Sequence, residues 1–224
     1  MTRALDELQV ADDAWPEIQK WASAGDNAVE ITEAEREDGE RALLQLQVTT
    51  RSVLGALALH AAVVAVDHGW VRVLGAGGRG APASLIDPVP GSATAPLDLE
   101  DGLMIANDAL GGFFVVNGGG LPGAPREVLY LAPDTLRWEQ TGLGHSDWLR
   151  WLLGADLDRY YERTRWAGWQ AEVRDLRNDQ AIHTYPPLFT KEGRDIAAAS
   201  RRAVPVGELW SLWLGFRQQL GIDD

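Results

Sequence analysis

The feature that most constrains the fold is a run of three short apolar segments separated by glycines. These segments are residues 103–106, 113–116 and 128–131, and Gly111-Gly112 and Gly118-Gly119-Gly120 lie between them. Glycine accepts the backbone conformations of tight turns, and short β-rich segments at this spacing are typical of an antiparallel meander. The sequence therefore predicts three antiparallel strands in the middle of the chain.

Further strands are expected on both sides of this meander. Residues 62–66 and 70–74 are rich in valine and are separated by Asp67-His68-Gly69, which predicts a hairpin. Residues 135–139 alternate polar and apolar side chains like an edge strand, and residues 29–31 do the same over a shorter stretch. Residues 53–59 fit a buried helix or a buried strand equally well, although their alanines favour a helix.

Helical patterns dominate the two ends of the chain. Trp15, Ile18 and Ala22 recur at helical spacing after Asp12-Asp13, which can cap the start, and residues 35–47 suit a second helix. After residue 139 the sequence predicts only helices: one capped by Ser146, one opened by Asp156 and Asp158, one carrying Trp166 and Trp169, and one after Pro205.

This order of elements predicts an α+β fold, with a mainly antiparallel sheet of about five or six strands and helices packed on one face. A chain of 224 residues suits a single domain, which we expect to comprise a helical segment 1–51, a core 52–153 and a helical extension 154–224. Residues 75–99, rich in glycine and proline, are expected to form a long surface loop.

The composition of the chain indicates in which compartment the protein lies and which class of partner it binds. The chain has no cysteine, and no apolar run has the length of a signal peptide or a membrane span, so we expect a cytoplasmic protein. The formal net charge of −13 argues against nucleic acid as a partner. Residues 26–40 hold seven acids and one arginine, either as a solvated face or as a surface for a basic partner.

Motifs for known chemistry are incomplete. The glycine-rich residues 75–80 follow a strand, but no helix comes directly after them to bind a phosphate. His60, His68, His145 and His183 lack the spacing of metal ligands, and no Gly-x-Ser-x-Gly elbow offers a nucleophile. We therefore expect no cofactor, no metal and no catalytic residue, and the enzyme question stays open.

Two groups of residues are candidates for binding. Arg165, Trp166 and Trp169 combine cationic and aromatic side chains: they form either core packing or, if exposed, a protein-binding hot spot. The second group would line a small-molecule pocket near residues 75–80, to which turns and strand ends would contribute polar side chains, and its members are Asp67, His68, Asn107, Asp108 and Asn117.

Five blocks of the sequence resemble a bacterial family labelled only as a domain of unknown function. The blocks are residues 67–75, 107–119, 129–139, 165–169 and 185–193. This resemblance runs through nearly the whole chain and implies no activity.

A more distant resemblance concerns the order of elements in residues 52–153. A strand, a Gly-Gly turn, an aromatic strand, another strand and a helix opening at Ser146-Asp147-Trp148-Leu149 are similar to the SUKH superfamily, which departs from this chain at His60-Ala61-Ala62. That superfamily includes toxin-immunity proteins, which bind protein partners without catalytic residues. The resemblance implies a non-enzymatic protein-binding function. The polar residues near Gly75–Gly80 keep open an alternative, a small-molecule or nucleotide-derivative binder or a hydrolytic enzyme. We leave open whether the chain is a monomer or a homodimer.

Overall fold

The computed structural model describes residues 2–78, 83–86 and 102–223. The helices are α1 (Leu5–Leu8), α2 (Trp15–Ala24), α3 (Arg36–Leu46), α4 (Val53–His60), α5 (His145–Gly154), α6 (Leu157–Tyr160), α7 (Trp169–Arg174), the short 3-10 helix η1 (Glu192–Arg194) and α8 (Val206–Leu220). The strands are β1 (Val29–Glu33), β2 (Ala61–Val66), β3 (Val71–Leu74), β4 (Gly102–Asp108), β5 (Phe113–Asn117), β6 (Glu127–Leu131), β7 (Trp138–Gly144), β8 (Gln180–Tyr185) and β9 (Ser200–Pro205).

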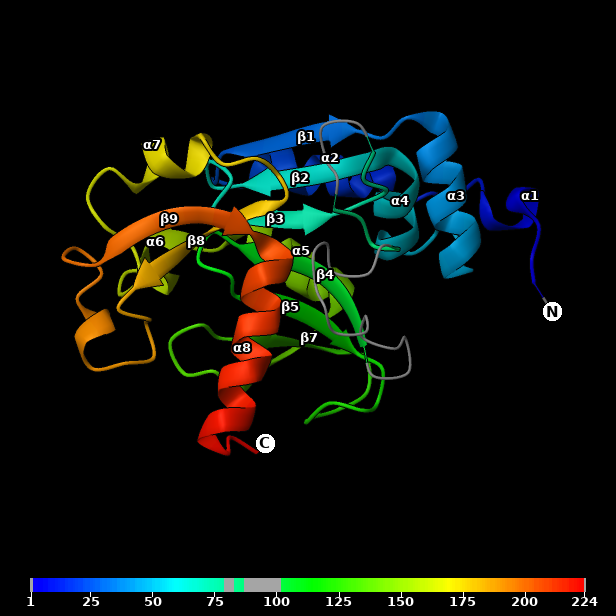
Figure 1. Ribbon diagram of the computed structural model, residues 1–224. Helices are drawn as coiled ribbons and strands as arrows, with labels where there is room; N and C mark the ends of the chain where they lie inside the picture. Colours follow the sequence, from blue (N-terminus) through cyan, green and yellow to red (C-terminus); the bar gives the residue numbers. More distant parts are fainter. Residues whose placement is uncertain (1, 79–82, 87–101, 224) are drawn as a thin grey trace.

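A seven-stranded sheet organises the molecule, with the strands in the order β1 to β7 (Figure 1). Every neighbouring pair is antiparallel. The predicted α+β class, the antiparallel meander and the hairpin are thus confirmed. The sheet has seven strands rather than five or six, with the segments predicted near residues 29–31 and 135–139 at its two edges as β1 and β7, and β8 and β9 form a separate two-stranded sheet.

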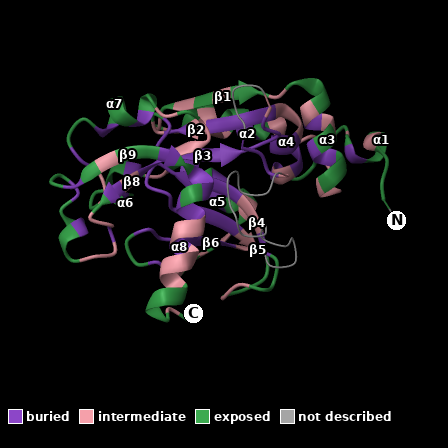
Figure 2. Cartoon of the chain, in the orientation of Figure 1, coloured by how far each residue is buried: buried purple, intermediate pink, exposed green. Residues whose placement is uncertain are grey.

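Both faces of the large sheet are covered, rather than one face as predicted. Successive residues of a strand point to opposite faces. On β5, Phe114 packs against Trp148 of α5 with ring centroids 5.1 Å apart, whereas Phe113 packs against Trp210 of α8 at 5.0 Å. Figure 1 shows α8 and the β8–β9 pair in front of the sheet and α5 behind it. The central strands are accordingly buried (Figure 2).

Of the N-terminal helices, α4 has a side-chain cap, whereas Ala14, and not Asp12 or Asp13, occupies the N-cap position of α2. The backbone N–H of Trp15 donates to Asp13 Oδ1 at 2.7 Å, and Pro16 lies in the first turn of α2. Residues 53–60 form a helix, for which Ser52 Oγ accepts the backbone N–H of Gly55 at 3.0 Å. The predicted helical segment 1–51 also contributes β1, so it belongs to the same sheet as the core.

Several predictions for the C-terminal half are wrong in detail. The extension 154–224 is not entirely helical, because β8 and β9 lie between α7 and α8. Gly144, and not Ser146, occupies the N-cap position of α5. The helix α7 begins at Trp169, so Trp166 precedes it instead of sharing its face. Asp156 does cap α6, accepting the N–H of Arg159 at 3.0 Å.

Two predicted boundaries also shift. The seventh strand starts at Trp138 because Leu136 has a φ of 56° and closes a turn onto Ala132. In the described part of the predicted surface loop, Ala76, Ala83 and Leu85 are buried in the core. The rest of that loop, residues 79–82 and 87–99, lies outside the described residues.

Candidate functional site

The turn between β2 and β3 holds the first candidate, Asp67. Asp67 and His68 both have positive φ, 53° and 57°, which matches the mirror-image turns that favour hairpins. Asp67 forms an ion pair with Arg165, which also contacts Asp158 at 2.6 Å. The side chain of Arg165 is only 7% exposed, so this ion pair lies inside the protein.

Aromatic rings surround the Arg165 guanidinium. Its central carbon lies 4.2 Å from the ring centroid of Trp169, 4.7 Å from that of Trp70 and 5.3 Å from that of Tyr161. The negative faces of aromatic rings stabilise a cation, most strongly where water is excluded. We call these side chains, together with Asp67 and Asp158, the Arg165 cage.

Trp166 packs at the rim of this cage. Its indole N–H donates to Glu172 Oε1 at 2.7 Å, and the Arg201 guanidinium covers its ring at 4.5 Å. Arg201 also pairs with Glu172 at 3.0 Å. Trp166 and Trp169 are each 6% exposed, so the structure shows the core-packing alternative and the hot spot lacks the exposure it requires.

Asp108 is a structural centre of the turn between β4 and β5. Its Oδ1 accepts the backbone N–H groups of Leu110 and Gly112 at 2.9 and 2.8 Å, and its Oδ2 accepts the hydroxyl of Tyr130 at 2.5 Å. Burial raises the pKa of Asp108 and that of Tyr130. Because its oxygens face the turn and a core tyrosine, Asp108 is not available to a ligand.

The other polar candidates do not converge on one pocket. Asn107 is buried on β4, and Asn117 is buried at the far end of β5, where its amide holds the following loop through Gly119 and Leu121. Asn107 pairs with Phe113, which lies at the end of β5 opposite to Asn117. Four residue steps along the strand place positions 113 and 117 about 13 Å apart. The single pocket predicted for these residues is therefore not assembled. Part of the 75–80 loop also lies outside the described residues.

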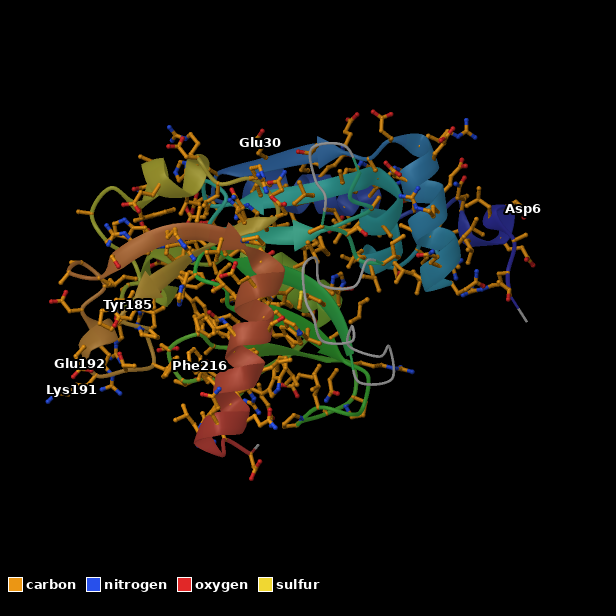
Figure 3. The ribbon with its side chains drawn as sticks, viewed as in Figure 1. Asp6, Glu30, Tyr185, Lys191, Glu192 and Phe216 are labelled. Carbon is orange, nitrogen blue, oxygen red and sulfur yellow. The ribbon has the colours of Figure 1, made fainter. Side chains whose placement is uncertain are left out.

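The acidic segment is exposed along an edge of the sheet. β1 pairs only with β2, and Figure 3 shows Glu30 projecting from it. Glu40 pairs with Arg36 at 2.7 Å and Asp38 with Arg41 at 2.6 Å. The remaining acids are exposed and have no ion pair with any described residue, and we call them the acidic face: Asp26, Glu30, Glu33, Glu35 and Glu37.

A cavity of about 410 Å³ opens beside the acidic face. Trp15, Glu33, Glu40 and His60 are among its lining residues. The rings of Trp15 and His60 stack with centroids 5.2 Å apart, and His60 Nε2 lies 2.8 Å from Asp13 Oδ2. Neither Trp15 nor His60 was predicted as a binding residue. They belong to α2 and α4, which lie far apart in the sequence and meet only in the folded chain.

Arg72 is a second residue missed at the sequence level. It lies between Val71 and Val73 on β3 and is 2% exposed. An arginine within a short valine-rich strand is the signal that could have identified it, since a buried strand seldom carries a charge without a partner.

One class of site and one kind of segment are not found in the part of the chain that the structure describes. No group of three or more His, Asp or Glu side chains could hold a metal ion there. No helix of that part is long and apolar enough to cross a membrane.

Comparison with known proteins identifies relatives over most of the chain. It is 37% identical over 211 residues to the uncharacterised protein YbfG of Escherichia coli strain K12, covering 94% of this chain and 95% of that protein. It is 28% identical to an uncharacterised protein of Haemophilus influenzae, covering 84% and 82% of the two chains.

No solved structure matches the chain significantly. The comparisons thus give no support to the distant SUKH resemblance. Residues 5–209 match the family model described as protein of unknown function DUF2625. This match covers most of the chain and agrees with the resemblance to a bacterial domain of unknown function, so the chain belongs to the DUF2625 family.

Proposed function

We propose that this protein is a non-enzymatic binding protein whose acidic face receives a basic segment of a protein partner. The observation that carries the proposal is the cavity of about 410 Å³ beside Trp15, which is bordered by the carboxylates of Glu33 and Glu40. An arginine or lysine side chain of the partner would enter this cavity.

The lining of the cavity includes one cation, the exposed Arg36, which pairs with Glu40 and which the partner's cation would displace or join. The half-buried indole of Trp15 offers a π surface, and cations bind tryptophan faces more strongly than other rings. Glu33 has no ion pair among the described residues, so its carboxylate is available to a basic side chain of the partner. The Asp13–His60 contact holds the floor of the cavity in place.

The adjacent edge strand extends the surface. Within residues 2–78, 83–86 and 102–223, no strand pairs with the outer side of β1, and such an edge offers backbone groups to an incoming chain. Glu30 and Glu33 would oppose the same edge of a second copy by charge repulsion and attract a basic strand instead. We therefore also propose that the protein is a monomer. Solution scattering should then give a radius of gyration of about 17 Å.

A synthetic ten-residue peptide that alternates lysine and threonine provides the probe. Titrated into the full chain, it should shift the amide NMR signals of β1 and the indole signal of Trp15, and its affinity should fall as salt rises. Glu33→Gln should weaken binding about threefold to fivefold, the range of one exposed ion pair.

Glu192→Gln is the matched control, since Glu192 is an exposed glutamate of η1 that Figure 3 places far from Glu30. It should bind the peptide like the wild type. Equal weakening by both variants, or signal shifts spread evenly over the surface, would show only general attraction to an acidic protein and refute the proposal.

A further inference from the structure

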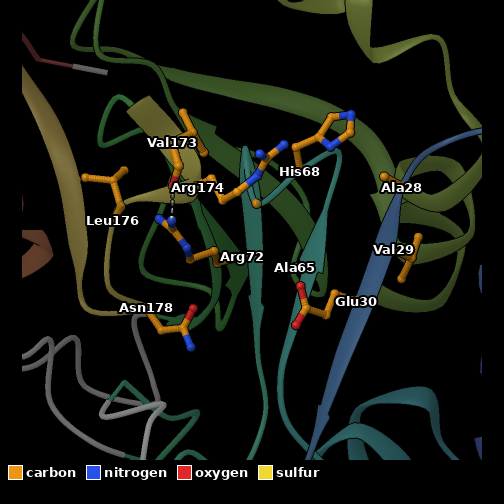
Figure 4. Close-up of a pocket in the computed structure, with 11 residues that line it drawn as sticks. Ala28, Val29, Glu30, Ala65, His68, Arg72, Val173, Arg174, Leu176 and Asn178 are labelled. Atoms are coloured by element: carbon orange, nitrogen blue, oxygen red, sulfur yellow. Dashed lines mark hydrogen bonds between the residues drawn. The ribbon is translucent and has the colours of Figure 1, made fainter. Parts of the chain in front are cut away.

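A second cavity lies beside the β2–β3 hairpin. It has a volume of about 260 Å³, and its lining comes from β1, β2, β3, α7 and the loop after α7 (Figure 4).

Strand register explains why the cavity exists. Glu30 pairs with Ala65, Ala65 with Arg72, and Arg72 with Asn107, so these four side chains form a row on one face of the sheet. Ala65 is the shortest of them. Its methyl group leaves the space between Glu30 and Arg72 unfilled.

Arg72 is a buried cation without a carboxylate partner. Its Nη1 donates to the carbonyl of Gln180 at 2.9 Å and its Nη2 to that of Val173 at 3.3 Å. No carboxylate of residues 2–78, 83–86 or 102–223 lies within ion-pair distance of it. The nearby Asp179 is bound to Arg177 at 3.0 Å. Burial lowers the pKa of Arg72 to about 10, so the side chain keeps its charge at neutral pH.

Other lining side chains add positive charge and hydrogen-bond donors. Arg174 is exposed and makes no ion pair with any described residue, and His68 reaches the cavity from the hairpin turn. Gly69 lies beside the guanidinium: a Cβ at this position would be 3.8 Å from Arg72 Nη2. Glu30 supplies the acid among the lining residues, and its carboxylate lies across Ala65 from Arg72.

We propose that this cavity binds a small oxyanion, a carboxylate or a phosphate group, with Arg72 at its base and Arg174 at its mouth. Guanidinium groups bind both kinds of oxyanion through paired, charge-assisted hydrogen bonds. Two of the five N–H groups of Arg72 are used by the carbonyls, which leaves donors for a ligand. This cavity is distinct from the one beside Trp15, although Glu30 belongs both to its lining and to the acidic face.

The test titrates the full chain with inorganic phosphate in one arm and with succinate in the other, at an ionic strength held constant with sodium chloride. Calorimetry gives the affinity, and the side-chain Nε–H NMR signal of Arg72 reports contact at the site. We expect a saturable shift of this signal. Phosphate alone, succinate alone or both would each support the site and name the oxyanion that it prefers.

Three variants separate binding from folding. Arg174→Gln should weaken binding about tenfold, because one charge-assisted contact is lost at an exposed position. Ala65→Leu should abolish binding by filling the cavity, while both variants keep the native NMR spectrum elsewhere. Arg163→Gln is the matched control, since Arg163 is an exposed arginine outside the cavity, and it should bind like the wild type.

The proposal fails if neither anion shifts the Arg72 signal in a saturable way. It fails equally if Ala65→Leu binds as the wild type does, or if Arg163→Gln weakens binding as much as Arg174→Gln. Failure of this test leaves the lysine-threonine peptide experiment unaffected, because that experiment is decided by the Trp15 signal and by Glu33→Gln, and neither residue lines this cavity.

Discussion

Arg165 and Arg72 are both buried cations beside the same hairpin, yet their surroundings differ. Arg165 contacts Asp67 and Asp158, and three aromatic rings lie around it. Arg72 contacts only two backbone carbonyls and borders a cavity. Arg165 is paired with carboxylates, whereas among the described residues Arg72 has two carbonyl partners and the nearby Asp179, which is itself paired with Arg177.

The difference separates a structural role from a ligand-binding role. A buried charge is costly unless opposite charges and hydrogen bonds compensate it. In the Arg165 cage the protein supplies that compensation, so the cage stabilises the fold and has no capacity for a ligand. At Arg72 the compensation is incomplete, and an anion from solution would complete it.

The largest effect is expected for Arg165→Met. Removing one partner of a buried ion pair leaves Asp67 and the aromatic rings without their cation, which should lower the free energy of unfolding by about 3–5 kcal/mol. Urea denaturation measures this loss. Arg163→Gln, an exposed neighbour, should be unchanged. A loss below about 1 kcal/mol would show that the cage is not a main source of stability.

The next prediction concerns His145, a third buried basic side chain. Unlike the two arginines, a histidine can be buried in its neutral form. Both ring nitrogens of His145 are buried and have no hydrogen-bond partner in the described residues. Burial lowers the pKa of His145 to about 4 from 6.5. The unfolded chain therefore takes up a proton near pH 6.5, while the folded protein does so only near pH 4.

Stability should accordingly fall as the pH drops from 6.5 to 4, by up to about 3 kcal/mol from this group. His145→Phe should remove that part of the pH dependence and keep the packing against Trp148. Urea denaturation at several pH values gives the difference between the two proteins. Parallel curves for wild type and variant would contradict the assignment of this loss to His145.

Arg72→Met should cost much less than Arg165→Met. The variant loses two hydrogen bonds to carbonyls, but it also removes a desolvated charge that has no ion pair, so the net loss of unfolding free energy should be about 1 kcal/mol. The same denaturation experiment compares the two variants. If both variants lost the same free energy of unfolding, the charge of Arg72 would be as well compensated as that of Arg165. The two arginines would then not differ in the way described above.

The sequence predicted the fold where local patterns decide the structure. Apolar runs bounded by glycines predicted β4, β5 and β6, and Asp67-His68-Gly69 predicted the β2–β3 turn. β8 and β9 were missed because their pairing joins segments that are distant in sequence, and β9 buries little besides Val204. Covering of both sheet faces also depends on tertiary packing of Phe113 and Phe114.

The candidate site was harder to predict, for the same reason. The sequence suggested that Trp169 and Arg165 lie together, but their partner Asp67 is 98 residues from Arg165. The polar side chains proposed for one pocket are separated by strand direction: Asn107 and Asn117 lie at opposite ends of the sheet strands. The valine-rich strand marks Arg72 in the sequence, but the positions of the carboxylates around it depend on the fold.

The smallest effect is expected for Arg51→Gln, which tests whether burial explains the contrast. Arg51 pairs with Asp12 through contacts of 2.5 and 3.1 Å, a geometry as good as that of the Arg165 cage, but their side chains are 69% and 61% exposed. Water and salt screen such a pair, so the variant should unfold at the same urea concentration as the wild type. If Arg51→Gln instead destabilised the protein as much as Arg72→Met, exposure would not be what distinguishes these arginines, and the charge at Arg72 would not by itself indicate a ligand.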